Sequence, residues 1–264
     1  MADRVVPGPV DGSAVIREAV SVNTRKIFDS CRDKDCVDDL RVFPTVSSQS
    51  YIENALSIRA RQAELLYVDV GVEPVSFNRG YYTVDATYFY RITGETFPAG
   101  QTVTGLAVFD KRVMLFGSVA GVKTFSSEFP LSGLGADDLP VAVVNSVDPI
   151  CLSCKLVEST CLLPTELEGR SIPSRISAAF PEQLILSDTS RRWFATIGQF
   201  SIIRLERDTQ LLLPAYDYSM PDKECPDAVT EDDPCSLFSR IRFPMDEFFP
   251  PDSISECEDY RSLR

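Results

Sequence analysis

Eight cysteines and no histidine define the chemistry open to this 264-residue chain. Histidine is the most common general base and a frequent metal ligand, so its absence excludes a serine or cysteine triad of the usual kind. Cysteine offers disulfide cross-links, thiolate ligation of a metal, and thiol redox reactions. The cysteines form three groups along the chain: Cys31 and Cys36; Cys151, Cys154 and Cys161; and Cys225, Cys235 and Cys257.

The first two groups can be combined into a metal site or treated as separate thiols. Cys31 and Cys36 are separated by four residues, which allows a small disulfide loop if the chain turns, or two thiolate ligands. Cys151 and Cys154 of the CLSC motif would then complete a four-thiolate zinc site. Only the CLSC half has the usual spacing, so we expect disulfides or free buried thiols. Redox catalysis by CLSC is not favoured, because no helix N-terminus is expected there to lower a thiol pKa.

The acidic residues beside the first cysteine pair give a second candidate site. Asp33, Asp35 and Asp38 could bind a calcium ion through carboxylate oxygens. The glycine and the distant glutamate of an EF-hand loop are missing, so we interpret these aspartates as solvated surface. A structural calcium or zinc ion remains an alternative, and no other cofactor is expected.

The net charge limits the partners of the chain. The formal charge is −13 and the isoelectric point is near 4.5, which opposes binding to the phosphate backbone of nucleic acids. The start of the chain lacks the apolar core of a Sec signal, and no run of about 18 apolar residues is present. We therefore expect synthesis in the cytoplasm, no nucleic-acid partner and no membrane insertion. Cysteine-rich chains usually belong in oxidising compartments, so later release from the cell would reconcile the two observations.

The elements that position these residues are predicted to be mainly β. Residues 80–97 alternate apolar and polar side chains as a half-buried strand does. Its aromatic residues could form a sugar-stacking face, but filling a core is the interpretation we favour: Tyr81, Tyr82, Tyr88, Phe89 and Tyr90. Other predicted strands are 37–43, the later part of 50–75 after a helical turn, 103–109, 113–119, 141–147, 193–206 and 210–213. A helix is predicted in the later half of 174–186, after Pro181.

This pattern predicts an antiparallel β-sandwich or two packed β-domains with extended N- and C-terminal arms. The predicted organisation is an arm at 1–21, a β-domain at 22–140, a second β-rich segment or domain at 141–216, and an acidic tail at 217–264 rich in proline and cysteine.

Four segments resemble a family of uncharacterised hypothetical proteins from anaerobic spore-forming Firmicutes. They are VNTRKIFDSCRDKDCVDDLRVFPT, VEPVSFNRGYYTVDATYFYRI, SIIRLERDTQLLLPAYDYSMPDKEC and EDDPCSLFSRIRFP. The family has no established activity, so the resemblance implies a lineage and supplies no catalytic residues. It also implies a setting at the spore envelope or its appendages, because such proteins are made in the mother cell without a Sec signal and are exposed when that cell lyses.

The sequence favours a non-enzymatic structural protein that self-assembles into a surface layer, filament or shell. Long strands offer edges for pairing, the arms can wrap a neighbour, and cysteines can lock the contacts in a homo-oligomer or polymer. Four apolar tail residues are expected to pack against a neighbouring subunit or, in the alternative, on their own domain: Phe238, Phe243, Phe248 and Phe249. The alternative is a β-sandwich module that binds glycans or another protein.

Overall fold

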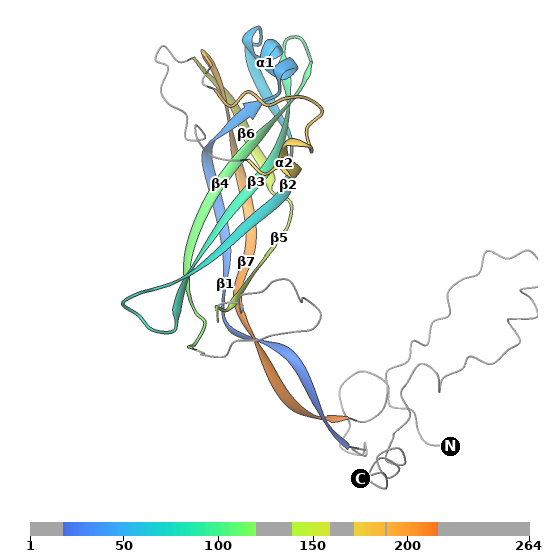
Figure 1. Ribbon diagram of the computed structural model, residues 1–264. Helices are drawn as coiled ribbons and strands as arrows, with labels where there is room; N and C mark the ends of the chain where they lie inside the picture. Colours follow the sequence, from blue (N-terminus) through green and yellow to red (C-terminus); the bar gives the residue numbers. More distant parts are fainter. Residues whose placement is uncertain (1–17, 120–138, 159–171, 188, 216–264) are drawn as a thin grey trace, which may run out of the picture. The chain divides into compact units, whose positions relative to one another are not determined.

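A computed structural model describes residues 18–119, 139–158, 172–187 and 189–215 of the chain (Figure 1). The elements are β1 (Glu18–Pro44), α1 (Val46–Glu53), β2 (Ser57–Pro74), β3 (Tyr81–Phe97), β4 (Thr102–Phe116), β5 (Val141–Ser146), β6 (Ile150–Glu158), α2 (Ser174–Ser177) and β7 (Arg191–Ala215). The predicted mainly β, antiparallel fold is confirmed.

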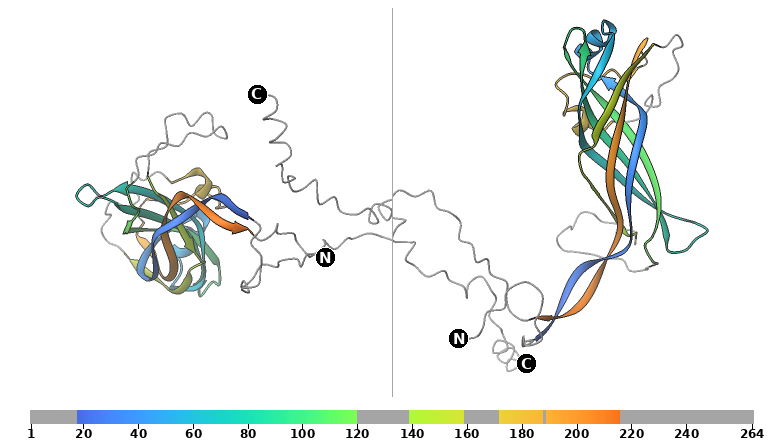
Figure 2. Two further views of the ribbon diagram at one scale, coloured as in Figure 1. Left: turned by 90° about the horizontal axis from the view of Figure 1, so that it is seen from below. Right: turned by 180° about the vertical axis from the view of Figure 1, so that it is seen from behind.

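The strands form one sheet that folds over on itself. Its order is β2-β3-β4-β1-β7-β5, and β6 also pairs with β7. Strands β1 and β4 pair only where Val42–Pro44 lie opposite Gly105–Ala107, so the two strands separate beyond that junction. Strand β2, at one edge, lies beside β5 and β6 at the other. The result is a sandwich-like body in which β2-β3-β4 faces β1-β7 with β5 and β6, and the strands surround a common interior (Figure 2).

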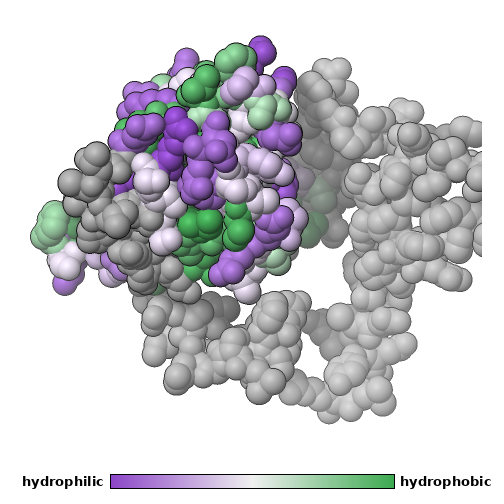
Figure 3. All heavy atoms as spheres, turned by 90° about the horizontal axis from the view of Figure 1, so that it is seen from above, coloured by the Kyte–Doolittle hydropathy of each residue, from purple (hydrophilic) through white to green (hydrophobic). Residues whose placement is uncertain are grey.

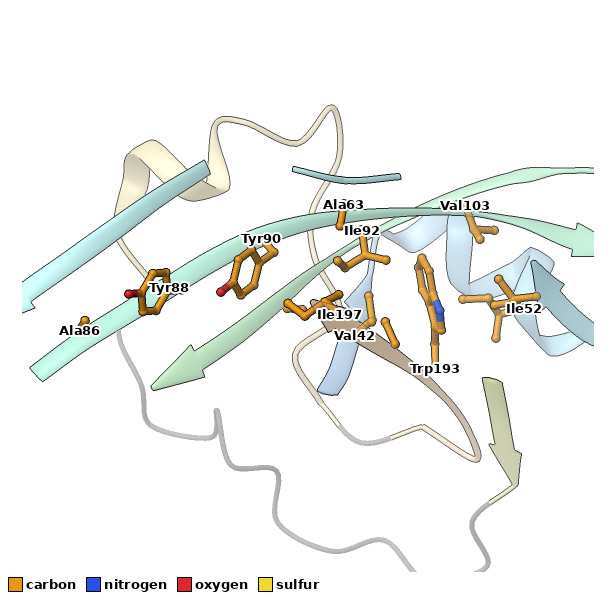
Figure 4. Packing of buried hydrophobic residues seen from close by; sticks show 13 residues of the cluster. Val42, Ile52, Ala63, Ala86, Tyr88, Tyr90, Ile92, Val103, Trp193 and Ile197 are labelled. Atoms are coloured by element: carbon orange, nitrogen blue, oxygen red, sulfur yellow. The ribbon is translucent and has the colours of Figure 1, made fainter. Parts of the chain in front are cut away.

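Alternation of side chains along the strands fills this interior. On β3 the inward residues are those of even number, and Tyr88, Tyr90 and Ile92 are fully buried. Trp193 and Ile197 project from β7 toward the same space (Figure 4). Because the aromatic run of β3 contributes to this core, the predicted packing role of Tyr82, Tyr88 and Tyr90 is confirmed.

A left-handed residue adjusts the alternation of β1. Asp39 has φ of 54°, a conformation that aspartate tolerates better than most residues. Before it, Cys31 and Val37 pack against the core; after it, Leu40 and Val42 do so. The inward positions therefore change from odd to even numbers at Asp39.

The junction between β1 and β4 requires a glycine. A Cβ atom on Gly105 would lie 2.7 Å from the carbonyl oxygen of Phe43 and 2.7 Å from Cγ1 of Val42. Both distances are shorter than van der Waals contact, so only glycine lets the two strands approach here. Gly71 on β2 has no atom within 4 Å of the equivalent position.

The two helices close different parts of the body. Helix α1 begins after Thr45, whose Oγ1 accepts a hydrogen bond from the Ser48 backbone N–H, and Ile52 of this helix is buried in the main core. Helix α2 follows Pro173 and places Ile176 against Phe89 on the outer face of β3. In the described part of the chain, neither helix is long and apolar enough to span a membrane.

Several predicted element boundaries are wrong, and the reasons are physical. Residues 103–109 and 113–116 lie on one strand, β4, and the predicted strand 113–119 ends early, at Phe116. Residues 193–206 and 210–213 likewise lie on one strand, β7. In β4 the intervening Asp110, Lys111 and Arg112 continue the ladder with β3 instead of turning. The predicted helix after Pro181 is absent from residues 172–187, where α2 precedes that proline.

The chain divides into two units. Thr24–Thr209 is one, and the predicted boundary at 140/141 falls inside it, because β5 and β7 share a sheet with β1. The other unit is Met1–Asn23 with Gln210–Arg264, of which residues 18–23 and 210–215 are described. These are the ends of β1 and β7, and within them Leu211, Leu212 and Leu213 are exposed.

Candidate functional sites: an ionic bridge, a dithiol and an apolar surface

An ionic bridge joins β1 and β4 where their backbones have separated. The ammonium group of Lys111 on β4 lies 2.5 Å from a carboxylate oxygen of Asp33 and 2.5 Å from one of Asp35, both on β1. The Lys111 side chain is only 10% exposed. Nearby, the backbone N–H of Phe116 donates to Oδ2 of Asp29 at 3.0 Å. Side chains of β1 therefore replace the missing ladder between these strands.

The bridge shifts the pKa values of its members in opposite directions. Burial alone would lower the pKa of Lys111, but hydrogen bonds to Asp33 and Asp35 and their negative charges raise it above its ordinary value. The hydrogen bond from Lys111 lowers the pKa of Asp33. The raised pKa of Lys111 and the lowered pKa of Asp33 both favour the charged pair at neutral pH.

The ammonium group takes the position between two aspartates where the sequence allowed a calcium ion. Asp38 does not join Asp33 and Asp35, because it lies on the opposite, exposed face of β1. Over the described residues, no group of three or more cysteine, aspartate or glutamate side chains is placed to hold a metal ion.

Several buried polar groups of the interior have no hydrogen-bond partner of normal geometry among the described residues. The Tyr88 and Tyr90 hydroxyls, Oε1 of Gln199 and Oγ of Ser201 are buried and make no hydrogen bond in the described structure. Burial raises the pKa of Tyr90, so it stays protonated. Buried groups of this kind are usually satisfied by ordered water.

The first cysteine pair is not brought together. Cys31 and Cys36 lie five residues apart on the uninterrupted strand β1, which separates them by roughly 16 Å along the strand. Cys31 is half-buried and Cys36 is exposed. They form neither the small disulfide loop nor a shared metal site. Because a four-thiolate zinc site with Cys151 and Cys154 needs both of these cysteines at one metal ion, their separation excludes that site as well.

The second pair is brought together by an irregularity in β6. Residues three apart on a regular strand point to opposite faces. The register of β6 on β7 shifts between Cys151, opposite Ile197, and Ser153, opposite Thr196, so that Leu152 is an extra residue in a β-bulge. Cys151 and Cys154 consequently both pack against the main core, with their sulfur atoms 3.9 Å apart.

The two thiols have unequal acidity. A hydrogen bond from the Cys151 thiol lowers the pKa of Cys154 to about 7, against the opposing effect of burial. The same hydrogen bond, together with burial and the charge of Cys154, raises the pKa of Cys151. The buried indole N–H of Trp193 makes no hydrogen bond within normal geometric limits, yet its attraction for a Cys154 thiolate lowers the pKa further.

An apolar surface lies on the outer side of the same strands. Its residues come from β7, β6 and the β5–β6 connection and are 45% to 60% exposed: Val147, Ile150, Leu152, Phe200 and Ile202. Ile150 lies opposite Gly198 in the β6–β7 register, and a Cβ atom on Gly198 would be 3.8 Å from the Leu152 side chain. The Leu152 side chain of β6 therefore lies over Gly198 of β7 at ordinary van der Waals distance.

Positive charge borders this apolar surface on the β1 side. The Lys34 ammonium lies 5.8 Å from the centre of the Phe200 ring, and Arg32 is on the same outward face of β1. The rest of the chain is strongly acidic. The surface thus combines an exposed apolar centre with a partly basic border.

Hydrophobic residues also reach the surface at the end of the body that carries α1. The exposed ones there are Val46, Tyr51, Leu56 and Phe97. Figure 3, a view onto this end, shows hydrophobic residues scattered among hydrophilic ones. Scattered apolar residues are normal on protein surfaces, so this end is a weaker candidate.

The remaining predicted site residues lie outside the described part of the chain: Cys161, Cys225, Cys235, Cys257, Phe238, Phe243, Phe248 and Phe249. The sequence did not identify Lys111, because its two carboxylate partners, Asp33 and Asp35, lie on β1 and come close to it only in the folded chain. It also missed the bulge at Leu152, for which the sequence holds no turn residue.

Comparisons of the chain with protein-family models, with curated proteins and with solved structures give no match.

Proposed function

We propose that this chain is a non-enzymatic structural protein that assembles with copies of itself through the apolar surface on β6, β7 and the β5–β6 connection. The observation that carries the proposal is the group of exposed side chains at Val147, Ile150, Leu152, Phe200 and Ile202. Contiguous apolar side chains on the outside of a sheet indicate an interaction site, because leaving them in water is unfavourable. Two of them follow each other on the outward face of β7, so they present one continuous strip.

The occupant we assign to this surface is the C-terminal tail of a neighbouring copy. The tail sequence combines four phenylalanines, at 238, 243, 248 and 249, with many acidic residues. Phenylalanine side chains match the apolar centre, and the carboxylates match Lys34 and Arg32 at its border. A head-to-tail contact of this kind repeats from copy to copy and produces a ring or a filament.

A surface layer or appendage is the setting we propose for such an assembly, at the spore or cell surface after release from the cytoplasm. A formal charge of −13 favours solubility while the protein accumulates in the cell. The basic border of the apolar surface then favours binding of acidic segments of a neighbouring copy.

Gel filtration with light scattering and negative-stain microscopy of the full-length protein test the proposal. We expect rings or filaments for the wild type, and smaller particles for the double variant Phe200→Ser with Ile202→Ser. Both side chains are outward and exposed, so the variant is expected to fold. The matched control is Phe77→Ser in the β2–β3 connection. Phe77 is 92% exposed and is not part of the apolar surface on β6 and β7. Circular dichroism checks folding of each variant.

The tail is tested in the full chain by replacing its four phenylalanines with serine. Loss of assembly in both the tail variant and the Phe200 and Ile202 variant, with Phe77→Ser unaffected, supports the proposed contact. A wild-type monomer at high concentration contradicts self-assembly. In that case the same apolar surface becomes the candidate for binding a different protein, which is the second function that the sequence suggested.

The glycan-binding form of that alternative loses its predicted surface. Tyr82, Tyr88, Phe89 and Tyr90 are buried and cannot stack on a sugar, and of the five aromatic residues only Tyr81 is partly exposed.

A further inference from the structure

We propose that Cys151 and Cys154 are a reversible redox pair that closes an intramolecular disulfide by exchange with a small-molecule disulfide. The pair is built by the β-bulge at Leu152, which turns both side chains of the CLSC motif to the interior of the body. The sulfur atoms are 3.9 Å apart, and a disulfide requires about 2.0 Å. Rotation about the side-chain bonds of two residues on one face of a strand has to supply the difference.

The roles of the two sulfurs follow from their surroundings. Cys154 is the attacking thiolate, because its sulfur lies near the indole N–H of Trp193 and 3.9 Å from the sulfur of Cys151, whose thiol can donate to it. That indole is buried and has no other hydrogen-bond partner in the described structure. A negative sulfur beside it satisfies the donor, whereas a neutral thiol is a poor acceptor. Cys151 retains its proton and is the resolving thiol.

The exchange balances in two steps. The Cys154 thiolate attacks one sulfur of a disulfide RS–SR, the S–S bond breaks, and RS⁻ leaves and takes up a proton. Cys151 then loses its proton and attacks the Cys154 sulfur of the mixed disulfide, and the second RS⁻ leaves. The protein loses two electrons and two protons, and RS–SR is reduced to two RSH.

Two other described cysteines serve as internal references. Cys36 is exposed, while Cys31 is half-buried, and the two lie roughly 16 Å apart along β1. Burial raises the pKa of Cys31, which makes it less reactive than Cys154. Neither residue has a second thiol across a bulge. An exposed thiol without a neighbouring cysteine exchanges with glutathione disulfide to give a mixed disulfide.

Peptide mapping of the full-length protein tests the proposal. The protein is reduced, equilibrated with glutathione and glutathione disulfide in varied ratio, quenched with acid, alkylated and digested with trypsin. No lysine or arginine lies between Lys123 and Lys155, so one tryptic peptide, residues 124–155, contains both cysteines and no other. Disulfide closure makes this peptide lighter by two hydrogen atoms and blocks alkylation at both positions.

We expect the closed peptide to dominate at oxidising ratios and to reopen on reduction. In the Cys151→Ser variant, we expect glutathione to remain on Cys154. In Cys154→Ser, we expect the pair to resist oxidation, and Cys36→Ser is the matched control that leaves closure unchanged. A peptide that stays reduced at every ratio, or cysteines 151 and 154 linked to other cysteines, overturns the proposal. The mapping gives the same result for monomers and assemblies, so its failure is distinct from failure of the proposed function.

Discussion

Removing the buried cation of the ionic bridge should destabilise the protein strongly. The variant Lys111→Met keeps the length and the apolar stem of the side chain but leaves two carboxylates facing each other. Breaking a fully buried ion pair costs about 3 to 5 kcal/mol, whereas an exposed pair contributes about 0 to 1 kcal/mol. Lys111 is 10% exposed, but Asp33 and Asp35 are 40% and 21% exposed, so water partly solvates them. We therefore expect a loss of about 2 to 3 kcal/mol at pH 7.

Urea unfolding followed by tryptophan fluorescence measures this loss, since Trp193 is the single tryptophan and is buried. The matched control is Lys155→Met. Lys155 pairs with Asp39, but both side chains are more than half exposed, so its loss should cost less than about 1 kcal/mol. Combining Lys111→Met with Asp33→Asn and Asp35→Asn should recover much of the stability, because no charge is then left without a partner.

The pH dependence of the free energy of unfolding provides a second test of the ionic bridge. The pKa of Asp33 is lowered in the folded protein, so its contribution is complete above the ordinary aspartate pKa near 4 and is lost as pH falls through the lowered value. The difference between the wild type and Lys111→Met should therefore narrow as the solution is acidified. Equal losses for Lys111→Met and Lys155→Met, or no recovery in the triple variant, would refute a buried ionic bridge.

Three further predictions concern single positions. Gly105→Ala should destabilise the β1–β4 junction by about 1 to 3 kcal/mol in the same urea assay, while Gly71→Ala, which has open space, should change little; equal effects would contradict the close approach. The rate of iodoacetamide alkylation of Cys154 should rise with a midpoint near pH 7, well below that of an ordinary thiol, and a midpoint above pH 8.5 would show that its thiolate is not stabilised. Tyr90→Phe should be neutral or stabilising, because the hydroxyl is buried without a partner; a loss above about 1 kcal/mol would reveal a hydrogen bond through water.

Alternation of side chains was enough to predict the β-rich body. It correctly identified β3, because the pleat of this strand is regular, and β3 pairs antiparallel with β2 and β4, its neighbours in sequence. It failed where charged residues continue a strand, as at Asp110 to Arg112 in β4. There the charges point outward or into the ionic bridge, and local composition alone resembles a turn.

The candidate sites were less predictable, because each depends on contacts between distant segments. The CLSC motif was visible, but only the register of β6 on β7 shows that both sulfurs share a face. The aspartates at 33 and 35 were visible as possible ligands, but their partner is a lysine more than 70 residues away. Conversely, Cys31 and Cys36 are near in sequence and are kept apart by an uninterrupted strand.

The extra residue in β6, Leu152, determines what both faces of this strand present. The register shift between Cys151 and Ser153 leaves Leu152 as the bulged residue, and its side chain is exposed to solvent. The same shift turns the sulfur atoms of Cys151 and Cys154 inward. If β6 kept a regular pleat through Leu152, the Cys151 and Cys154 side chains, three residues apart, would lie on opposite faces of the strand. Leu152 also supplies one exposed side chain of the apolar surface. The proposed thiol exchange in the core and the proposed assembly contact on the outside thus both depend on Leu152.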